Sequence, residues 1–136
     1  MSQKQRLAAE IEAKIKTKVD SGEFMFNFSY IMDGGYFSTK GVKCRGCAIS
    51  ACAFALGGVD AISMNESDSI PRYDPRVTIN DIAQLEMGFE GWKYWKAHDG
   101  RKLFPTTRAA FYKLGQKLRA EHPEYSGLSI LNTASP

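Results

Sequence analysis

The apolar pattern of this chain is most continuous between Cys47 and Leu56, where nearly every residue is small or apolar. A segment that is apolar on all sides is buried, and its many alanines favour a helix over a strand. Gly57 and Gly58 follow directly, and glycine readily takes the left-handed conformation at which many helices end. We therefore expect a central buried helix over 47–56, with the rest of the chain packed around it.

Residues 3–20 form the first of three amphipathic helices that the pattern predicts. Its apolar positions recur at i, i+4, i+8 and i+12, and most of its lysines lie off that stripe. The stripe comprises Leu7, Ile11, Ile15 and Val19. We interpret the lysine-rich side as a solvated face, with a nucleic-acid or membrane surface as the alternative.

We expect the second amphipathic helix to run from a cap at Thr78 or Asn80 to about Trp95. A helix that breaks near Gly91 is the alternative. Thr78 and Asp81 are similar to a capping box. The buried stripe of this helix comprises Ile82, Leu85, Phe89 and Trp92.

The third amphipathic helix is expected to begin at a cap at Thr106 or Thr107 and to end at the His122-Pro123 pair. Its buried stripe comprises Phe111, Leu114 and Leu118. The tail over 124–136 is expected to dock loosely on the rest.

Two segments between the helices have other patterns. Residues 26–30 alternate apolar and polar, which predicts a strand, and the Asp33-Gly34-Gly35 turn predicts a hairpin with a returning strand over 36–39. A helical turn over 28–32 is the alternative. Residues 59–77 are polar and contain two prolines, so we expect a long loop without secondary structure, a kind of segment that is often functional.

These elements predict a mostly α (α+β) fold, a compact bundle of about four helices around the central apolar helix with a small β-hairpin. The 136 residues are expected to form one domain, with residues 1–22 as its N-terminal helix. The chain has 43% hydrophobic and 24% charged residues, which is typical of globular proteins. No run reaches the roughly 18 apolar residues that span a bilayer. With three cysteines and no apolar export signal, we expect reduced thiols, a cytoplasmic location and no membrane partner.

Charge is distributed unevenly along the chain, although the net charge is only +3. The segment 101–119 has no acidic residue, and its six cations are Arg101, Lys102, Arg108, Lys113, Lys117 and Arg119. Such a segment favours an anionic partner, with a solvated basic helix as the alternative. The aromatic residues just upstream, Trp92, Tyr94 and Trp95, are candidates to stack on bases.

The cysteines suggest two kinds of chemistry. Cys44 and Cys47 have the spacing of half a zinc site, but the sequence offers no second pair, so we expect neither a metal nor another cofactor. Cys47 is also expected at a helix N-terminus, where a thiolate is stabilised, and His98 follows it in the order found in papain-like and NlpC/P60-like peptidases. We interpret Cys47 as a buried structural residue, with catalysis by Cys47 and His98 as the alternative.

Residues 26–31 and the run from Cys44 to Ala53 resemble small uncharacterised phage and bacterial proteins. Those proteins contain F-D-M-x-x-W, then C-G-T-x-x-C-[IL]-A-G, then an apolar helix and a leucine-rich acidic helix. The similarity covers about residues 24–95, and this chain departs from it at Asn27 and Tyr30. The resemblance carries no known activity and implies a phage accessory protein that acts on a host protein.

Three functional hypotheses follow. The first is a non-enzymatic intracellular binding protein, such as an inhibitor of a host factor, that uses the basic C-terminal helix and the segment 59–77. The second is a cysteine hydrolase with Cys47 and His98. The third is a nucleotide or nucleic-acid binder that uses the basic segment.

Overall fold

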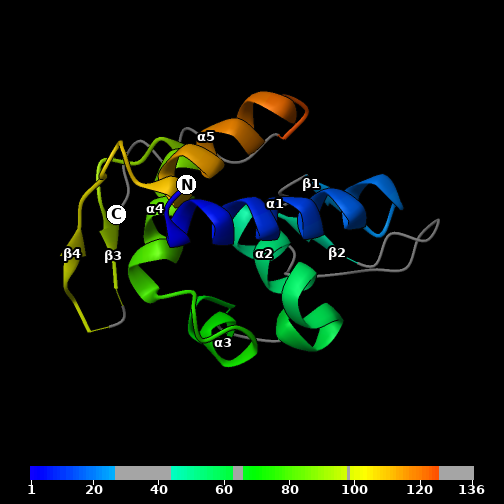
Figure 1. The fold of residues 1–136 in the computed structure, drawn as a ribbon, viewed down its shortest axis with the longest axis horizontal. Coiled ribbons are helices and arrows are strands. Elements are labelled where there is room, and N and C mark those ends of the chain that lie inside the picture. Colours follow the sequence, from blue (N-terminus) through cyan, green and yellow to red (C-terminus); the bar gives the residue numbers. More distant parts are fainter. Residues whose placement is uncertain (27–43, 63–65, 98, 126–136) are drawn as a thin grey trace.

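The computed structural model describes residues 1–26, 44–62, 66–97 and 99–125, and it is mostly helical (Figure 1). In chain order the helices are α1 (Gln3–Asp20), α2 (Ala48–Gly57), the short 3-10 helix η2 (Gly58–Ile62), α3 (Glu66–Tyr73), α4 (Ile79–Glu90) and α5 (Ala110–Glu121). The strands are β1 (Phe24–Phe26), β2 (Cys44–Gly46), β3 (Trp95–Lys96) and β4 (Lys102–Leu103). The mostly α fold with a small sheet is thus confirmed. No helix in the described ranges combines the length and the apolar character needed to cross a membrane.

The central apolar helix is α2, and its predicted bounds are confirmed to within one residue. Cys47 is its N-cap, and Gly58 ends it with φ at 69°, a conformation that glycine adopts without strain. Helices α1, α3 and α4 and both strands of the first sheet pack against it (Figure 1). Its fully buried side chains include Ala48, Cys52, Ala53 and Phe54. The small residues Ala48, Cys52 and Ala53 allow the neighbouring elements to approach closely.

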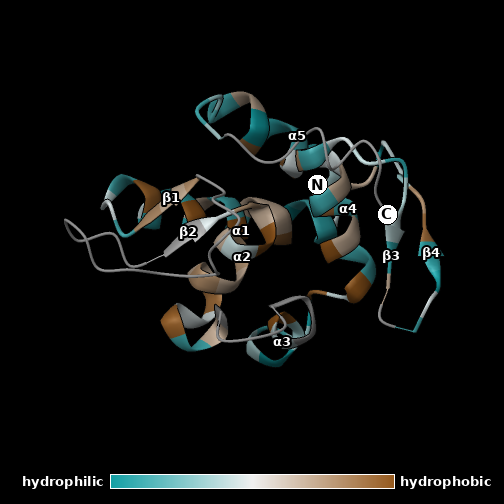
Figure 2. Ribbon diagram, turned by 180° about the vertical axis from the view of Figure 1, so that it is seen from behind, coloured by the Kyte–Doolittle hydropathy of each residue, from teal (hydrophilic) through white to brown (hydrophobic). Residues whose placement is uncertain are grey.

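Helix α1 is also as predicted, and its stripe of Leu7, Ile11 and Ile15 is buried against the core. Ser2 and Gln5 form a capping box at its start, which satisfies backbone N–H groups that the helix leaves unpaired. Seen from behind in Figure 2, α2 carries the tan and brown colours of hydrophobic residues, as expected for the element against which α1 packs.

Helices α4 and α5 form the closest helix pair in the described structure, and two glycines make that approach possible. A Cβ atom added at Gly88 would lie 2.1 Å from the carbonyl oxygen of Tyr112 on α5. A Cβ atom at Gly115 would lie 2.2 Å from the carbonyl oxygen of Leu85 on α4. Gly88 and Gly115 therefore both let α5 dock on α4, although glycine has a low intrinsic helix propensity.

The described strands include only Phe26 of the predicted hairpin, which therefore stays a prediction; residues 27–30 of its first strand and the alternative helical turn over 28–32 lie outside the described residues. Phe24, Met25 and Phe26 pair in parallel with Cys44, Arg45 and Gly46, so β1 is partnered by the segment that leads into α2. The predicted turn at 33–35 and the returning strand at 36–39 lie outside the described residues. The hairpin in the described structure is β3–β4, in which Trp95 is opposite Leu103 and Lys96 is opposite Lys102.

The segment 59–77 is not the unstructured loop that we expected, because it contains η2 and α3. Its buried residues Ala61, Ile70 and Val77 are too widely spaced to show a helical period, yet each one anchors the chain to the core. Ser69 Oγ also donates a hydrogen bond to the Ala61 carbonyl oxygen at 3.0 Å, which ties α3 to η2.

Two helix ends also correct the predictions. Helix α4 does not reach Trp95, which belongs to β3; it stops at Glu90, because Gly91 turns the chain with φ at 77°, which confirms the alternative of a break near Gly91. Its start is the predicted capping box of Thr78 and Asp81. Helix α5 begins only at Ala110, with Ala109 as N-cap, because the chain first forms a turn in which the Ala109 N–H donates to the Thr106 carbonyl oxygen at 2.8 Å.

Arg76 connects α1 to the segment before α4. Its guanidinium donates to Asp74 Oδ2 at 2.8 Å and to Glu10 Oε2 at 2.7 Å. These hydrogen bonds hold the pKa of both carboxyl groups below their ordinary values of 3.8 and 4.5.

We expect Gly88→Ala to lower the free energy of unfolding by about 1–3 kcal/mol, because its methyl group overlaps the Tyr112 carbonyl. Without that overlap, alanine would stabilise the helix by about 1 kcal/mol relative to glycine. The sign of the change in the free energy of unfolding therefore shows whether the overlap is present. Urea unfolding measures the change in the free energy of unfolding. Gln116→Ala, at an exposed position next to Gly115, is the matched control and should change stability by no more than about 0.5 kcal/mol. A stabilised Gly88→Ala variant would contradict the packing.

We expect Arg76→Gln to lower stability at pH 7 and to have less effect at pH 3. A carboxyl group whose pKa is lower in the folded state stabilises the fold above its unfolded-state pKa. That stabilisation is lost as the pH falls through the folded-state pKa, so the difference between variant and parent should shrink below about pH 4. Urea unfolding at both pH values measures it, and an equal difference at pH 3 and pH 7 would contradict it.

Candidate functional site

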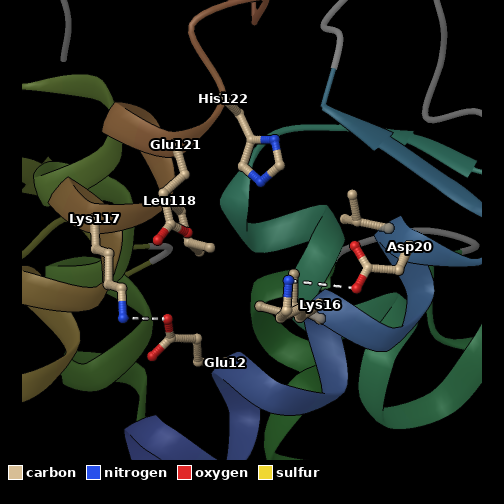
Figure 3. A pocket seen from close by; sticks show the side chains of 9 residues that line it. Glu12, Lys16, Asp20, Lys117, Leu118, Glu121 and His122 are labelled. Carbon is tan, nitrogen blue, oxygen red and sulfur yellow. Dashed lines mark ion pairs between the residues drawn. The ribbon is translucent and has the colours of Figure 1, made fainter.

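The α1–α5 groove is the space between these two helices, and it contains two adjoining hollows. The larger has a volume of about 380 Å³ and is lined by Ile15, Val19 and Leu118 together with charged side chains (Figure 3). The smaller has a volume of about 200 Å³ and is lined by residues that include Ala8 and Leu114. Glu12 and Lys117 line both hollows, so their side chains mark the boundary between them.

The groove opens because α1 and α5 run in the same direction and diverge (Figure 1). The smaller hollow is lined by the first halves of both helices, and the larger one by their last turns. Strand β1 fills the space beneath the divergence, where the Phe26 ring stacks on the His122 imidazole with centroids 4.4 Å apart. The groove therefore has a packed apolar floor and not an empty interior.

Ion pairs hold the charged side chains that cross the groove. Lys117 Nζ lies 2.7 Å from Glu12 Oε2, and this hydrogen bond raises the pKa of Lys117. Lys16 Nζ lies 3.3 Å from Asp20 Oδ2 on the same helix (Figure 3). These side chains are partly exposed, so an incoming charged group can exchange partners with them at small cost.

The two ends of the groove carry opposite charge. Arg108 and Lys113 lie at the end with the smaller hollow, and neither forms an ion pair within the described residues. Glu121, at the other end, likewise forms no ion pair with a described cation. Because both helices begin at the basic end, their dipoles add to its positive potential and to the negative potential of the other end.

The structure separates the six cations that the sequence placed together. Arg108, Lys113 and Lys117 lie at the groove. Arg101 and Lys102 lie on the β3–β4 hairpin, where Arg101 Nε binds Asp99 Oδ2 at 2.7 Å and Lys102 Nζ lies 4.7 Å from the Tyr94 ring centroid.

Arg119, the sixth cation, faces α4 and not the groove. Its guanidinium packs on the rings of Phe89 and Tyr125 and donates to the Phe89 carbonyl oxygen at 3.2 Å. Nearby, the Tyr125 hydroxyl donates to Glu90 Oε2 at 2.6 Å, and burial raises the pKa of Glu90. Arg119 thus has a packing role in the described structure.

Cys47 and Cys52 differ in environment. Cys47 is half-buried at the start of α2, and its Sγ lies 4.0 Å from Ser50 Oγ. Cys52 is fully buried, and burial followed by the charge of Asp74 raises the pKa of its thiol to about 12. The candidate pairing of Cys47 with His98 stays a prediction, because His98 lies outside the described residues. Strands β3 and β4, on either side of it in sequence, pack against α4.

The zinc hypothesis likewise stays a prediction. The Cys44 side chain lies outside the described part of the structure, and there is no cluster of three or more metal-binding side chains among the described residues.

Sequence reasoning missed the contribution of α1 to this site. Lys16 was interpreted as part of a solvated face and Glu12 was not singled out, whereas both line the groove together with α5. The one available signal was the shared four-residue spacing of Ile11 and Ile15 and of Leu114 and Leu118. That spacing predicts that each helix is buried on one side, but it does not specify which helix lies beside which.

We found no match to this chain among protein-family models, among curated proteins or among solved structures. The resemblance of residues 24–95 to phage and bacterial proteins therefore stays a prediction, and the functional argument rests on the geometry.

We expect the Cys52 thiol to react with iodoacetamide about a thousand-fold more slowly in the native protein than in urea at pH 8. Its pKa of about 12, raised from 9.0, leaves little thiolate, and the side chain is buried. Mass spectrometry of the Cys44→Ser/Cys47→Ser variant follows Cys52 alone. The matched variant Cys44→Ser/Cys52→Ser reports on Cys47, and equal native and unfolded rates for Cys52 would contradict its burial.

Proposed function

We propose that this chain is a non-enzymatic binding protein that holds an amphipathic, acidic segment of a partner protein in the α1–α5 groove. The observation that carries the proposal is the pair of cations at the basic end, Arg108 and Lys113, which no described acidic residue neutralises. An acidic group on the partner would supply the missing charge, and two helix N-termini would add to the attraction.

The floor of the groove explains why we propose a protein segment and not a small anion. Ile15, Val19 and Leu118 line the larger hollow beside its charged side chains, and apolar side chains of an amphipathic helix fit such a mixed lining. The opposite charges at the two ends favour one orientation, in which the acidic part of the segment meets Arg108 and Lys113 and a basic part meets Glu121. The Glu12–Lys117 pair between the hollows can exchange partners with either part.

This proposal keeps the basic C-terminal helix of the first hypothesis and adds α1 as the second wall. It replaces the segment 59–77, whose helix α3 packs on α2 and α4 and whose described residues line neither hollow. If the resemblance to phage proteins holds, the partner is a protein of the host cytoplasm and the chain acts as an inhibitor of it.

We expect a random peptide library, selected on the immobilised chain, to enrich amphipathic peptides with a cluster of acidic residues. Arg108→Glu/Lys113→Glu should weaken the selected peptides at least about 10-fold, because two attractive charges become repulsive. Isothermal titration calorimetry measures the affinities.

The matched control is Lys14→Glu/Arg72→Glu, which changes the net charge equally at exposed positions that do not line the groove. Circular dichroism of each variant checks that it is folded. Peptides that bind the Arg108→Glu/Lys113→Glu variant as tightly as the parent would contradict the proposed site.

A further inference from the structure

The β3–β4 hairpin presents two lysines side by side on its outer face. Lys96 and Lys102 are exposed and stand directly opposite each other in the strand register. Like charges at opposed positions of an antiparallel pair destabilise it. No described acidic side chain forms an ion pair with either lysine. The arrangement therefore costs stability within the chain itself, and an anionic ligand would compensate for that cost.

Two aromatic side chains lie on the same face of this hairpin. Tyr94 and Phe104 precede β3 and follow β4, two residues from Lys96 and Lys102, and side chains two apart share a face. Their ring centroids are 6.1 Å apart, and Lys102 Nζ lies 4.7 Å from the Tyr94 centroid. Phe104 is 61% exposed, which is unusual for so large an apolar side chain.

The other side of the hairpin is packed and holds it rigidly on α4. Trp95 and Ala97 are buried against Ala83 and Met87, with Trp92 packed beside them. This corrects the expectation that both tryptophans stack on bases, because Trp95 is only 8% exposed.

Gln84 fixes the position of Phe104. Its side chain is buried on α4 and donates from Nε2 to the Phe104 carbonyl oxygen at 3.0 Å. The same side chain accepts from the Thr106 backbone N–H at 2.7 Å. An exposed phenyl ring is thus carried on a backbone that is held from both sides.

Charge across this segment is strongly one-sided. Residues 93–108 contain five cations, Lys93, Lys96, Arg101, Lys102 and Arg108, against the single carboxylate of Asp99. That carboxylate is already paired with Arg101. The segment therefore favours a ligand with repeated negative charge.

We propose that the outer face of the β3–β4 hairpin binds single-stranded nucleic acid, with a base stacked on Phe104 beside Tyr94 and neighbouring phosphates bound by Lys96 and Lys102. Aromatic platforms flanked by cations bind single strands in this way, with little preference for sequence. Paired bases do not expose their ring faces, so a duplex gains only the charge contacts.

The test measures fluorescence anisotropy of a fluorescein-labelled oligothymidine of about 12 nucleotides, a length within the usual site size, over a range of KCl concentrations. We expect Lys96→Gln/Lys102→Gln to weaken binding and to reduce the slope of log affinity against log salt by about 1.4, since each phosphate contact contributes about 0.7. Phe104→Leu should weaken binding at least about 5-fold, because it removes the stacking surface.

Heparin separates stacking from charge, since it is a polyanion without bases. The lysine variant should weaken binding of both ligands, whereas Phe104→Leu should weaken only that of the oligonucleotide. Lys14→Gln/Arg72→Gln, with the same change of charge elsewhere, should leave both unchanged. Oligonucleotide binding that is absent, or that Phe104→Leu leaves unaltered, would overturn the proposal.

One further variant tests the paired lysines independently of any ligand. Lys96→Glu places opposite charges across the hairpin, so it should raise the melting temperature while it weakens oligonucleotide binding. A variant that is less stable than the parent, or that binds equally well, would contradict the role assigned to this pair. An acidic peptide that binds the hairpin while oligothymidine does not would also overturn the proposal.

Discussion

The contact on which the rest of the structure depends is the crossing of α4 and α5 at Gly88 and Gly115. There the backbones approach so closely that even a methyl group at either glycine would overlap a carbonyl oxygen of the other helix. Helix α4 carries the β3–β4 hairpin through Ala83 and Met87, and α5 forms one wall of the groove with α1. The crossing therefore positions both proposed binding surfaces, although neither glycine belongs to one of them.

Features that depend on neighbouring residues could be predicted from the sequence, and features that depend on distant ones could not. The bounds of α2 and the capping box of Thr78 and Asp81 follow from local rules of burial and hydrogen bonding. The position of the segment before α5 does not, because it depends on a buried glutamine 22 positions away that accepts a hydrogen bond from the Thr106 backbone N–H. The parallel pairing of β1 with β2 likewise joins residues that are far apart in the sequence, so no local turn signal predicts it.

The charged residues of the candidate site show the same difference between local and long-range features. Cations that are close in sequence appeared to form one basic surface, but helix geometry separates them. Lys113 and Lys117, four residues apart, share the face of α5 that lines the groove, whereas Arg119 is two residues further on and faces α4. Lys102 belongs to a strand whose partner places Lys96 opposite it, an opposition that only the strand register reveals.

The close crossing also determines how the two surfaces relate to each other. Ligands couple two sites only when they favour different arrangements of the elements between those sites. A crossing in which the backbones are already in contact leaves α4 and α5 little freedom to slide or rotate, since close-packed interiors have low compressibility. Buried Gln84 adds a second restraint, because it ties the backbone at Phe104 and Thr106 to α4. A protein segment in the groove and a strand of nucleic acid on the hairpin would therefore bind independently, so the chain would link its two partners without either one changing its affinity for the other.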